Sequence, residues 1–472
     1  MPEQTFVLSP LDHHGPRVYI RFALVFPVID YEPAIFDLQE ALRRTCDQLP
    51  FLKGRVYETG SENRGETYIT YNDESVPPRF GEIRAPEGFP SYKQLQFDRD
   101  PFPIHVFGTP VPKADAGFEA PVLVANYTKI DGGLVVCILA YHKIMDGGGY
   151  GEILRAISEN TRSSEAGTAA GIHPGDIFER RERLLGGSLQ VPQHVQALDF
   201  DEILRRHPEY ALKSKQNIVH GGAAAGTPKP GTGVNVVFGF SKHRIELIKK
   251  NLAGKLPAKW LTVNNILTAL IWASITNVRT TRAENPVQAS TSKMDFSVSG
   301  RRLLGPTVSG APYLVNCLGY ALTELTVDKL AFIPSESTIE RLEPVVASIA
   351  SASDRLTVDH MYELVQLSDT NPNLTDLVPS WFFYGGADLH FTSMAGVGLY
   401  DLDFGPHLGK PQYVRSAKIK FDGVCMMLPR KRVFEDEGEV DEAIEVSILL
   451  KDEDMERLIK NEAWRSWLVQ DN

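Results

Sequence analysis

The sequence predicts an α/β (α+β) protein with two domains, each built on a mixed sheet with flanking helices. A chain of 472 residues, 43% of them hydrophobic, can bury a large core and exceeds the usual size of one domain. Strand-like and amphipathic helical segments alternate in residues 1–175 and again in residues 234–472. The chain between them is rich in glycine and proline at residues 221–230 and cannot hold a regular core there. We therefore predict an N-terminal domain (1–175), a crossover linker (176–233) and a C-terminal domain (234–472).

Apolar patterns place four strands and two helices in the N-terminal domain. Ile35, Leu38, Leu42 and Cys46 recur at helical spacing, which predicts an amphipathic helix with one buried face. The predicted strands are Val18–Phe26, Glu66–Tyr71, Pro121–Thr128 and Leu134–Tyr141, and the predicted helices are Ala34–Leu49 and Gly151–Asn160.

The C-terminal domain again mixes strand-like and helical segments. An amphipathic helix begins near Ser241, and another helix follows over Thr262–Trp272. Two glycines and two prolines surround Phe404 in the segment Leu402–Pro411, which predicts a rigid and sharply turned loop.

Charge and composition narrow the class of partner. A formal net charge of -11 without a basic run argues against nucleic acid. The N-terminus lacks a basic segment followed by an apolar core, and no stretch approaches the roughly eighteen apolar residues of a membrane span. We therefore expect a cytoplasmic protein that does not span a membrane. The scattered cysteines indicate reduced thiols, and Asp12-His13-His14 has no matching second half, so no metal site is predicted.

The most informative motif is His-x-x-x-Asp-Gly, from His142 to Gly147, directly after the apolar strand Leu134–Tyr141. A histidine at the mouth of a buried strand can be kept neutral and aimed at a substrate hydroxyl or amine, as a general base working near pH 7 requires. Asp146 could orient the imidazole, or turn away and pin the loop through an ion pair. Gly147 and the two glycines after it suit a reaction channel, because they remove side chains where a ligand or backbone passes. Taken alone, the motif also fits a hydrogen-bonded histidine of the core.

The loop Leu402–Pro411 carries a second motif. An aspartate in such a turn usually caps backbone amides or pairs with an arginine, so we predict structural roles for Asp403 and Gly405. His407 is expected to be a packed or solvated loop histidine rather than a second functional imidazole.

Together, HKIMDG (His142–Gly147) and DFGPHLGKP (Asp403–Pro411) resemble the paired motifs HxxxDG and DFGWGKP of the BAHD family of acyl-CoA-dependent acyltransferases. The two additional residues before Gly-Lys-Pro are similar to the fungal branch. The similarity covers nearly the whole chain, from Leu8–Tyr19 to Asp454–Glu456.

This resemblance implies a fold similar to chloramphenicol acetyltransferase, with a solvent channel between two domains. Acyl-CoA, a co-substrate rather than a permanently bound cofactor, would enter one mouth of the channel and a small-molecule acceptor the other. His142 would deprotonate the acceptor, which attacks the thioester carbonyl directly, and would return the proton as CoA leaves. Family members are usually monomers, so we expect a monomer.

The resemblance also assigns structural and catalytic residues. Asp146 would turn away from the substrate and pair with an arginine of the C-terminal domain, either Arg301 or Arg302, of which Arg302 is favoured. The Thr-Ser-Trp that the family often presents near the channel centre is Thr392-Ser393-Met394 here. The Thr392 hydroxyl therefore remains a candidate donor to the tetrahedral oxyanion, while the indole N–H is lost.

CoA needs polar contacts at one mouth of the channel. Lys250, late in the helix that begins near Ser241, lies where the family places such contacts, although a solvated surface lysine is the alternative. Thr262 opens its helix beside free backbone amides and is a second candidate. Phe296 and Ser393 complete the predicted CoA contacts.

The favoured function is an acyl-CoA-dependent O-acyltransferase. By resemblance it is an O-acetyltransferase that acts on a hydroxyl of a fungal secondary metabolite such as a terpenoid or alkaloid. One alternative is a stand-alone condensation domain that takes acyl groups from a carrier protein, although such domains usually carry a further histidine where Tyr141 stands. The other is a non-catalytic homologue that binds a metabolite, which Met394 allows and the intact His142 and Asp146 oppose.

Overall fold

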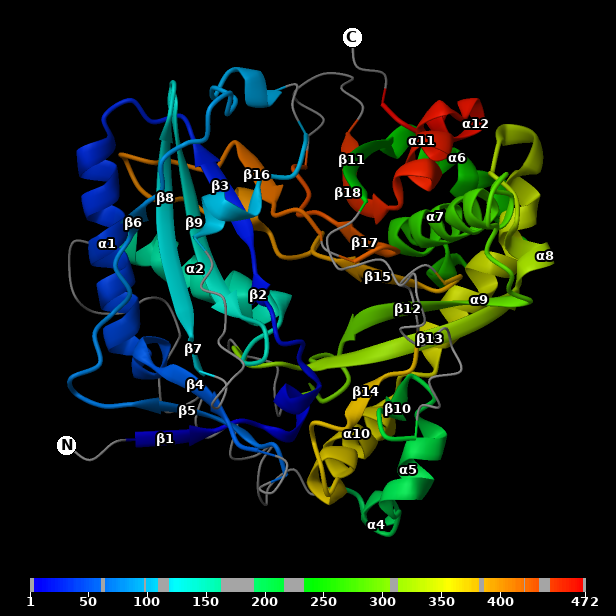
Figure 1. The fold of residues 1–472 in the computed structure, drawn as a ribbon, viewed down its shortest axis with the longest axis horizontal. Helices are drawn as coiled ribbons and strands as arrows, with labels where there is room; N and C mark the ends of the chain where they lie inside the picture. Colours follow the sequence, from blue (N-terminus) through cyan, green and yellow to red (C-terminus); the bar gives the residue numbers. More distant parts are fainter. Residues whose placement is uncertain are drawn as a thin grey trace.

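Two six-stranded sheets form the two halves of the molecule in the computed structural model, and helices cover them (Figure 1). We call the half that contains His142 the N-terminal half and the other the C-terminal half. The predicted mixed α/β fold class is confirmed. The structure describes residues 4–60, 64–96, 99–108, 119–162, 191–215, 233–305, 313–381, 386–419, 421–432 and 442–469.

The sheet of the N-terminal half has the strand order β16-β3-β9-β8-β6, and the short β2 pairs with β9. All residues of β9 are buried, because helices α1 and α2 and the loops around them enclose the sheet. The elements are β2 Tyr19–Ile20, β3 Phe22–Phe26, α1 Tyr31–Gln48, β6 Gly81–Glu82, β8 Leu123–Ile130, β9 Gly133–Tyr141, α2 Gly147–Arg162 and β16 Tyr413–Ser416. A four-stranded sheet adjoins them, in the order β1 (Gln4–Val7), β5 (Thr67–Tyr71), β4 (Arg55–Glu58) and β7 (Glu119–Pro121).

The sheet of the C-terminal half has the order β11-β18-β17-β15-β12-β13. Its central pairs β12·β15 and β15·β17 are parallel, and the other pairs are antiparallel. The helices α6, α7, α9 and α11 supply much of its core. The elements are β11 Val234–Ser241, α6 Lys242–Leu252, α7 Val263–Thr280, β12 Thr291–Ser299, β13 Leu318–Thr326, α8 Val327–Leu330, α9 Glu343–Asp354, β15 Leu389–Ser393, β17 Val424–Met427, β18 Ala443–Leu450, α11 Asp452–Lys460 and α12 Glu462–Arg465.

The described part of the predicted crossover, residues 191–215, is regular and packs on the C-terminal half. It contains α4 (Gln193–Gln196), α5 (Phe200–Arg206) and β10 (Tyr210–Leu212). β10 pairs with β14 (Leu377–Pro379), and α5 shares a small apolar core with α10 (Val358–Thr370). The glycine- and proline-rich stretch 221–230 lies outside the described residues.

One strand crosses between the halves. β16 comes from the last part of the chain but pairs antiparallel with β3, so that Val414 lies opposite Leu24. The predicted C-terminal domain therefore contributes an edge strand to the sheet of the N-terminal half, as the strands at the top of Figure 1 show.

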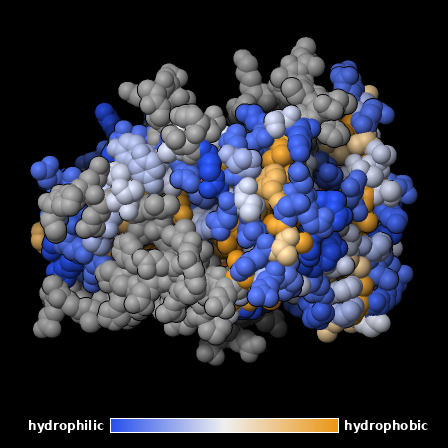
Figure 2. All heavy atoms as spheres, turned by 90° about the horizontal axis from the view of Figure 1, so that it is seen from below, coloured by the Kyte–Doolittle hydropathy of each residue, from blue (hydrophilic) through white to orange (hydrophobic). Residues whose placement is uncertain are grey.

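The predicted elements of the N-terminal domain occur with shifted ends, and the strand predicted over Val18–Phe26 is divided into β2 and β3. α2 begins at Gly147, not at Gly151 as predicted, so the glycines of the motif form the first turn of this helix. Among the described residues, no helix combines the length and apolar composition that crossing a membrane requires. On the face in Figure 2, hydrophilic residues cover most of the described surface of the C-terminal half, and apolar residues form narrow bands between them.

Candidate active site

A cavity of about 780 Å³ lies at the junction of the two halves, and His142 is on its wall. The N-terminal half lines it with β2, the beginning of β3 and the first turns of α2. The C-terminal half lines it with residues of β12, β13, β15 and β17. The volume is in the range of small-molecule sites, which are often found where two domains meet.

Segments from both halves hold the loop that carries His142. Its backbone N–H donates to the Val18 carbonyl at 2.7 Å. The Asn316 side-chain amide donates to the carbonyls of His142 and Lys143, at 3.1 Å each. Asn316 is itself fixed by Asp12, whose carboxylate accepts from its backbone N–H at 2.9 Å. The imidazole therefore projects from a backbone with little freedom to move.

Burial sets the protonation state of His142. Removal from water lowers the pKa of the imidazole, and the negative charge of Asp146 opposes this shift only in part. His142 is therefore neutral at pH 7, as a general base must be. Its Nδ1 is enclosed by protein, while the residue itself lines the cavity.

The buried carboxylate of Asp146 forms an ion pair with Arg301, whose side chain is partly exposed. The two guanidinium nitrogens donate to the two carboxylate oxygens at 2.7 Å each. The backbone N–H groups of Gly149 and Cys317 donate to the same carboxylate at 2.9 Å each. Burial by itself would raise the pKa of Asp146, but these donors hold it below its usual value.

The prediction that Arg302 is the partner of Asp146 was wrong. Arg302 is exposed, and the neighbouring Arg301 makes the pair. Arg301 also donates to the carbonyls of Tyr313 and Val315, at 3.0 and 3.1 Å. Its guanidinium is thus held on several sides by the C-terminal half while it reaches across to α2.

The glycines of the motif permit close contact between α2 and the C-terminal half. A Cβ atom on Gly149 would lie 1.9 Å from the Leu314 carbonyl oxygen, and one on Gly147 would lie 2.6 Å from the sulfur of Met394. The contact at Gly149 is with backbone, so only glycine fits there at the present spacing, whereas a side chain at Gly147 would require Met394 to move. Met394 therefore lies directly against the motif.

The residues predicted to face the substrate from β15 reach the cavity. Thr392, Ser393 and Met394 line it together with His142. Ser393 donates to the Met427 sulfur at 3.6 Å, and Thr392 lines the cavity.

Three predicted CoA contacts lie outside the cavity. Lys250 is exposed in the last turn of α6. Thr262 caps α7 by accepting from the backbone N–H of Asn265 at 3.1 Å. Phe296 is 3% exposed in the core of the C-terminal half. Because strand residues alternate between faces and Ser297 lines the cavity, the side chain of Phe296 points to the opposite face of the sheet.

The loop after Leu402 lies against the N-terminal half and outside the cavity lining. The Asp403 carboxylate accepts from the Gly405 backbone N–H at 3.0 Å, and Gly405 has a φ of 82°, which glycine adopts readily. Phe404 is buried against Phe26, with ring centroids 5.2 Å apart. His407 pairs with Asp37 of α1 at 2.7 Å on the surface.

The sequence reasoning missed a second histidine in the cavity. His390 lines the same wall as Thr392, two residues later on one face of β15. Its Nδ1 pairs with the fully buried carboxylate of Asp295, and its ring stacks on Trp381 at 5.6 Å. Burial raises the pKa of Asp295 to about 6, against the opposing effect of His390. The His-x-Thr spacing on a strand was a usable signal, whereas the pairing with Asp295 was not readable from the sequence.

Comparisons with known proteins identify the family and the fold. The sequence model of the Transferase family matches residues 1–464. The trichothecene 8-O-acetyltransferase of Fusarium sporotrichioides is 27% identical over 99% of this chain and 98% of its own length. The crystal structure of F. sporotrichioides TRI101 complexed with coenzyme A and T-2 has a TM-score of 0.72 and 23% identity, over 98% of this chain and 99% of that one. Vinorine synthase has a TM-score of 0.61 and 16% identity, over 100% and 98% of the two chains.

Proposed function

The chain belongs to the Transferase family of acyl-CoA-dependent BAHD acyltransferases, and from this premise we propose that it acetylates a hydroxyl group of a fungal secondary metabolite such as a terpenoid. It is an acyltransferase with a small-molecule acceptor. The acetyl group and the acceptor class are supported by the names of its relatives, which include trichothecene and eremophilane O-acetyltransferases. The observation that carries the proposal is the neutral His142 on the wall of a cavity that both halves line.

The proposed reaction is a direct transfer. Nε2 of His142 takes the proton of the acceptor hydroxyl as its oxygen attacks the thioester carbonyl. The carbonyl oxygen becomes an oxyanion, to which the Thr392 hydroxyl donates a hydrogen bond. Collapse of the tetrahedral intermediate breaks the carbon–sulfur bond, and the CoA sulfur receives the proton from His142. No covalent bond to the protein forms in this sequence.

Asp146 has a structural role in this proposal. Its carboxylate oxygens already accept from Arg301 and from two backbone N–H groups, so no oxygen is free to hold the imidazole. The pair with Arg301 instead fixes the first turn of α2 against the C-terminal half. Asp403 and Gly405 similarly hold their own loop.

We assign His390 as a positioning residue for the acceptor. When its Nδ1–H donates to Asp295, its Nε2 can accept a hydrogen bond from a polar group of the substrate. The stacked Trp381 keeps the ring in one orientation. An acceptor with a second hydroxyl near the reacting one fits this arrangement.

Several residue assignments and two properties of the whole protein stay predictions. Lys250 and Thr262 remain candidates for the nucleotide part of CoA, which extends beyond the reacting thioester, and Ser393 remains one for the part inside the cavity. The cytoplasmic location and the monomeric state also stay predictions.

The test is CoA release from acetyl-CoA by the purified protein, measured with a thiol reagent against a panel of hydroxylated terpenoids and alkaloids. Acceptor-dependent release is expected, with acetylated product seen by mass spectrometry. His142→Ala should lower the rate by about 10²–10⁴-fold. His407→Ala, an exposed histidine outside the cavity, is the matched control and should keep the wild-type rate.

Other results would favour the alternatives. A rate that survives His142→Ala would overturn the assignment of the base. CoA binding without turnover on any acceptor would favour the non-catalytic homologue, and turnover only with a phosphopantetheinylated carrier would favour the condensation domain.

A further inference from the structure

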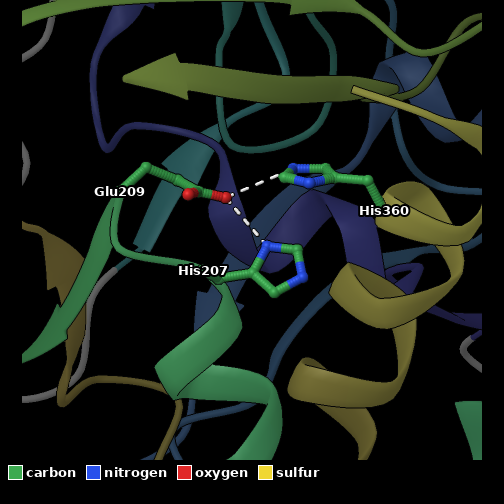
Figure 3. A group of neighbouring side chains, drawn as sticks. All are labelled: His207, Glu209 and His360. Atoms are coloured by element: carbon green, nitrogen blue, oxygen red, sulfur yellow. Dashed lines mark hydrogen bonds and ion pairs between the residues drawn. The ribbon is translucent and has the colours of Figure 1, made fainter. Parts of the chain in front are cut away.

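A second cluster of chemically reactive side chains lies outside the cavity, where the crossover packs on α10. His207 follows α5, Glu209 precedes β10, and His360 lies in the first turn of α10 (Figure 3). Nδ1 of His207 lies 2.8 Å from Oε1 of Glu209, and Nε2 of His360 lies 3.2 Å from the same oxygen. Each residue thus directs one potential ligand atom to a common point, and these atoms all lie within 4.8 Å of one another.

The donor set and its surroundings fit a zinc ion. Imidazole nitrogen and carboxylate oxygen are ordinary zinc ligands, and two histidines with one glutamate form a known three-residue set. Ligand atoms at about 2.0–2.1 Å from a tetrahedral zinc lie about 3.3 Å apart. The spacings of 2.8 and 3.2 Å approach this value. The side chains of His207 and Glu209 are 0% and 4% exposed, and that of His360 is 14% exposed, which gives an ion a route of entry.

A hydrogen-bonded network without metal accounts for the cluster less completely. Nε2 of His360 is buried without a hydrogen bond of acceptable geometry, although Glu209 is only 3.2 Å away. That contact is therefore an ion pair rather than a well-formed hydrogen bond. Ligands of one ion show this arrangement, because their lone pairs converge on the ion and not on one another.

The residues behind the cluster have the pattern that supports a metal-bound histidine. Nε2 of His207 lies 2.9 Å from the carboxylate of Glu363, which pairs with Arg206 at 2.6 Å. A carboxylate that accepts the second ring N–H of a ligand histidine fixes its tautomer and aims its lone pair at the metal. With its proton on Nε2 toward Glu363, His207 can turn the lone pair of Nδ1 to an ion that replaces the present contact with Glu209.

We propose that His207, Glu209 and His360 bind one zinc ion, with water in the fourth position. The ion joins residues 191–215 to α10 and so fastens the crossover to the C-terminal half. Its role is structural and independent of the acyl transfer proposed above.

The test uses the full chain, free of any affinity tag that contains histidine. The purified protein is expected to hold one zinc per chain by elemental mass spectrometry. After removal of zinc with a chelator, one equivalent of Co²⁺ should bind per chain and give the visible absorption bands of tetrahedral Co²⁺. Added Zn²⁺ should displace the Co²⁺ and remove these bands. Glu363→Gln should weaken Co²⁺ binding about 10–100-fold, as loss of a supporting carboxylate does.

Variants distinguish this site from binding elsewhere. His360→Ala should abolish the Co²⁺ signal while circular dichroism shows a folded chain. His194→Ala is the matched control, because His194 lies nearby on α4 and is exposed beside Asp359, outside the cluster. Failure of the folded wild type to bind Zn²⁺ or Co²⁺ would overturn the proposal and leave a network of hydrogen-bonded ion pairs. Unchanged Co²⁺ binding by His360→Ala would overturn it as well.

Discussion

At the scale of single residues, the reactivity of His142 follows from burial more than from a partner. The carboxylate that follows it in the motif is engaged by Arg301, so it does not hold the ring. A neutral imidazole is instead maintained because the protein around it solvates a positive charge poorly. The rigid loop then supplies the orientation that a partner would otherwise give.

The pH dependence of the reaction should reflect this burial. Because the pKa of His142 is lowered from its usual 6.5, the base stays unprotonated at more acidic pH than a free imidazole would. We expect kcat/KM to be constant around pH 7 and to fall only as the pH drops through a value below 6.5. Rates measured from pH 5 to 8 would check this. An acidic limb with its midpoint above 6.5 would contradict it, and circular dichroism at each pH would exclude unfolding.

His390 should affect acceptor binding more than the chemical step. Its replacement in His390→Ala removes one hydrogen bond to the acceptor, which corresponds to a rise in acceptor KM of about 3–10-fold. The KM for acetyl-CoA and the pH midpoint of kcat/KM should stay unchanged. A loss confined to kcat would show that His390 takes part in proton transfer instead. His407→Ala provides the baseline for loss of a histidine elsewhere.

The sequence revealed site residues that lie close together in the chain and missed those whose partners are distant in the chain. His142 and Asp146 lie four apart beside a strand, and the pattern is visible in the chain. Arg301 and Arg302 are adjacent just after β12, where a turn decides which of them faces α2, and the sequence does not determine that turn. His390 was missed because its partner, Asp295, lies 95 residues away on a parallel strand.

At the scale of elements, the first turn of α2 is the joint between the halves. Asp146, directly before this turn, pairs with Arg301, and Gly149 within it lies against the backbone of Leu314. The sequence predicted this helix but began it at Gly151, because glycines are poor helix formers. Contact with the C-terminal half outweighs that weak preference and extends the helix back to Gly147.

Breaking the ion pair should destabilise the protein strongly. Arg301→Ala leaves the carboxylate of Asp146 buried and unpaired, which costs about 3–5 kcal/mol in the free energy of unfolding. Urea denaturation would measure the loss. Arg302→Ala, which removes the exposed neighbour, should change the free energy by less than about 0.5 kcal/mol. Equal effects of the two variants would show that the pair contributes no more than a surface arginine.

At the scale of the whole molecule, the predicted domain boundaries do not coincide with the sheets, because β16 of the predicted C-terminal domain belongs to the sheet of the N-terminal half. The alternation of strands and helices was visible in the sequence, and so was the mixed character of both halves. The pairing of β16 with β3 in the N-terminal sheet was not visible, because the sequence of a four-residue strand does not determine which strand it pairs with. The regular structure of residues 191–215 depends likewise on packing against α10.

A destabilising substitution in β16 should therefore also destabilise the sheet of the N-terminal half. Val414→Asp places a charge at a position that is 1% exposed and opposite Leu24. We expect faster amide hydrogen exchange in β3 as well as in β16, and a loss of about 2–5 kcal/mol in stability. Exchange followed by mass spectrometry would locate the effect. Increased exchange confined to residues around 414 would contradict the role assigned to this strand.

The pairing of β16 with β3 also has a consequence for synthesis on the ribosome. The edge of β3, a run of five buried apolar residues, has no partner until Tyr413–Ser416 has emerged. About 390 residues separate the two segments, and at about 5–20 residues per second their translation takes on the order of 20–80 seconds. During that interval an apolar strand edge of the nascent chain is open to pairing with other chains. The open edge of β3 thus favours aggregation while the chain is being synthesised, and it is covered once β16 has paired with it.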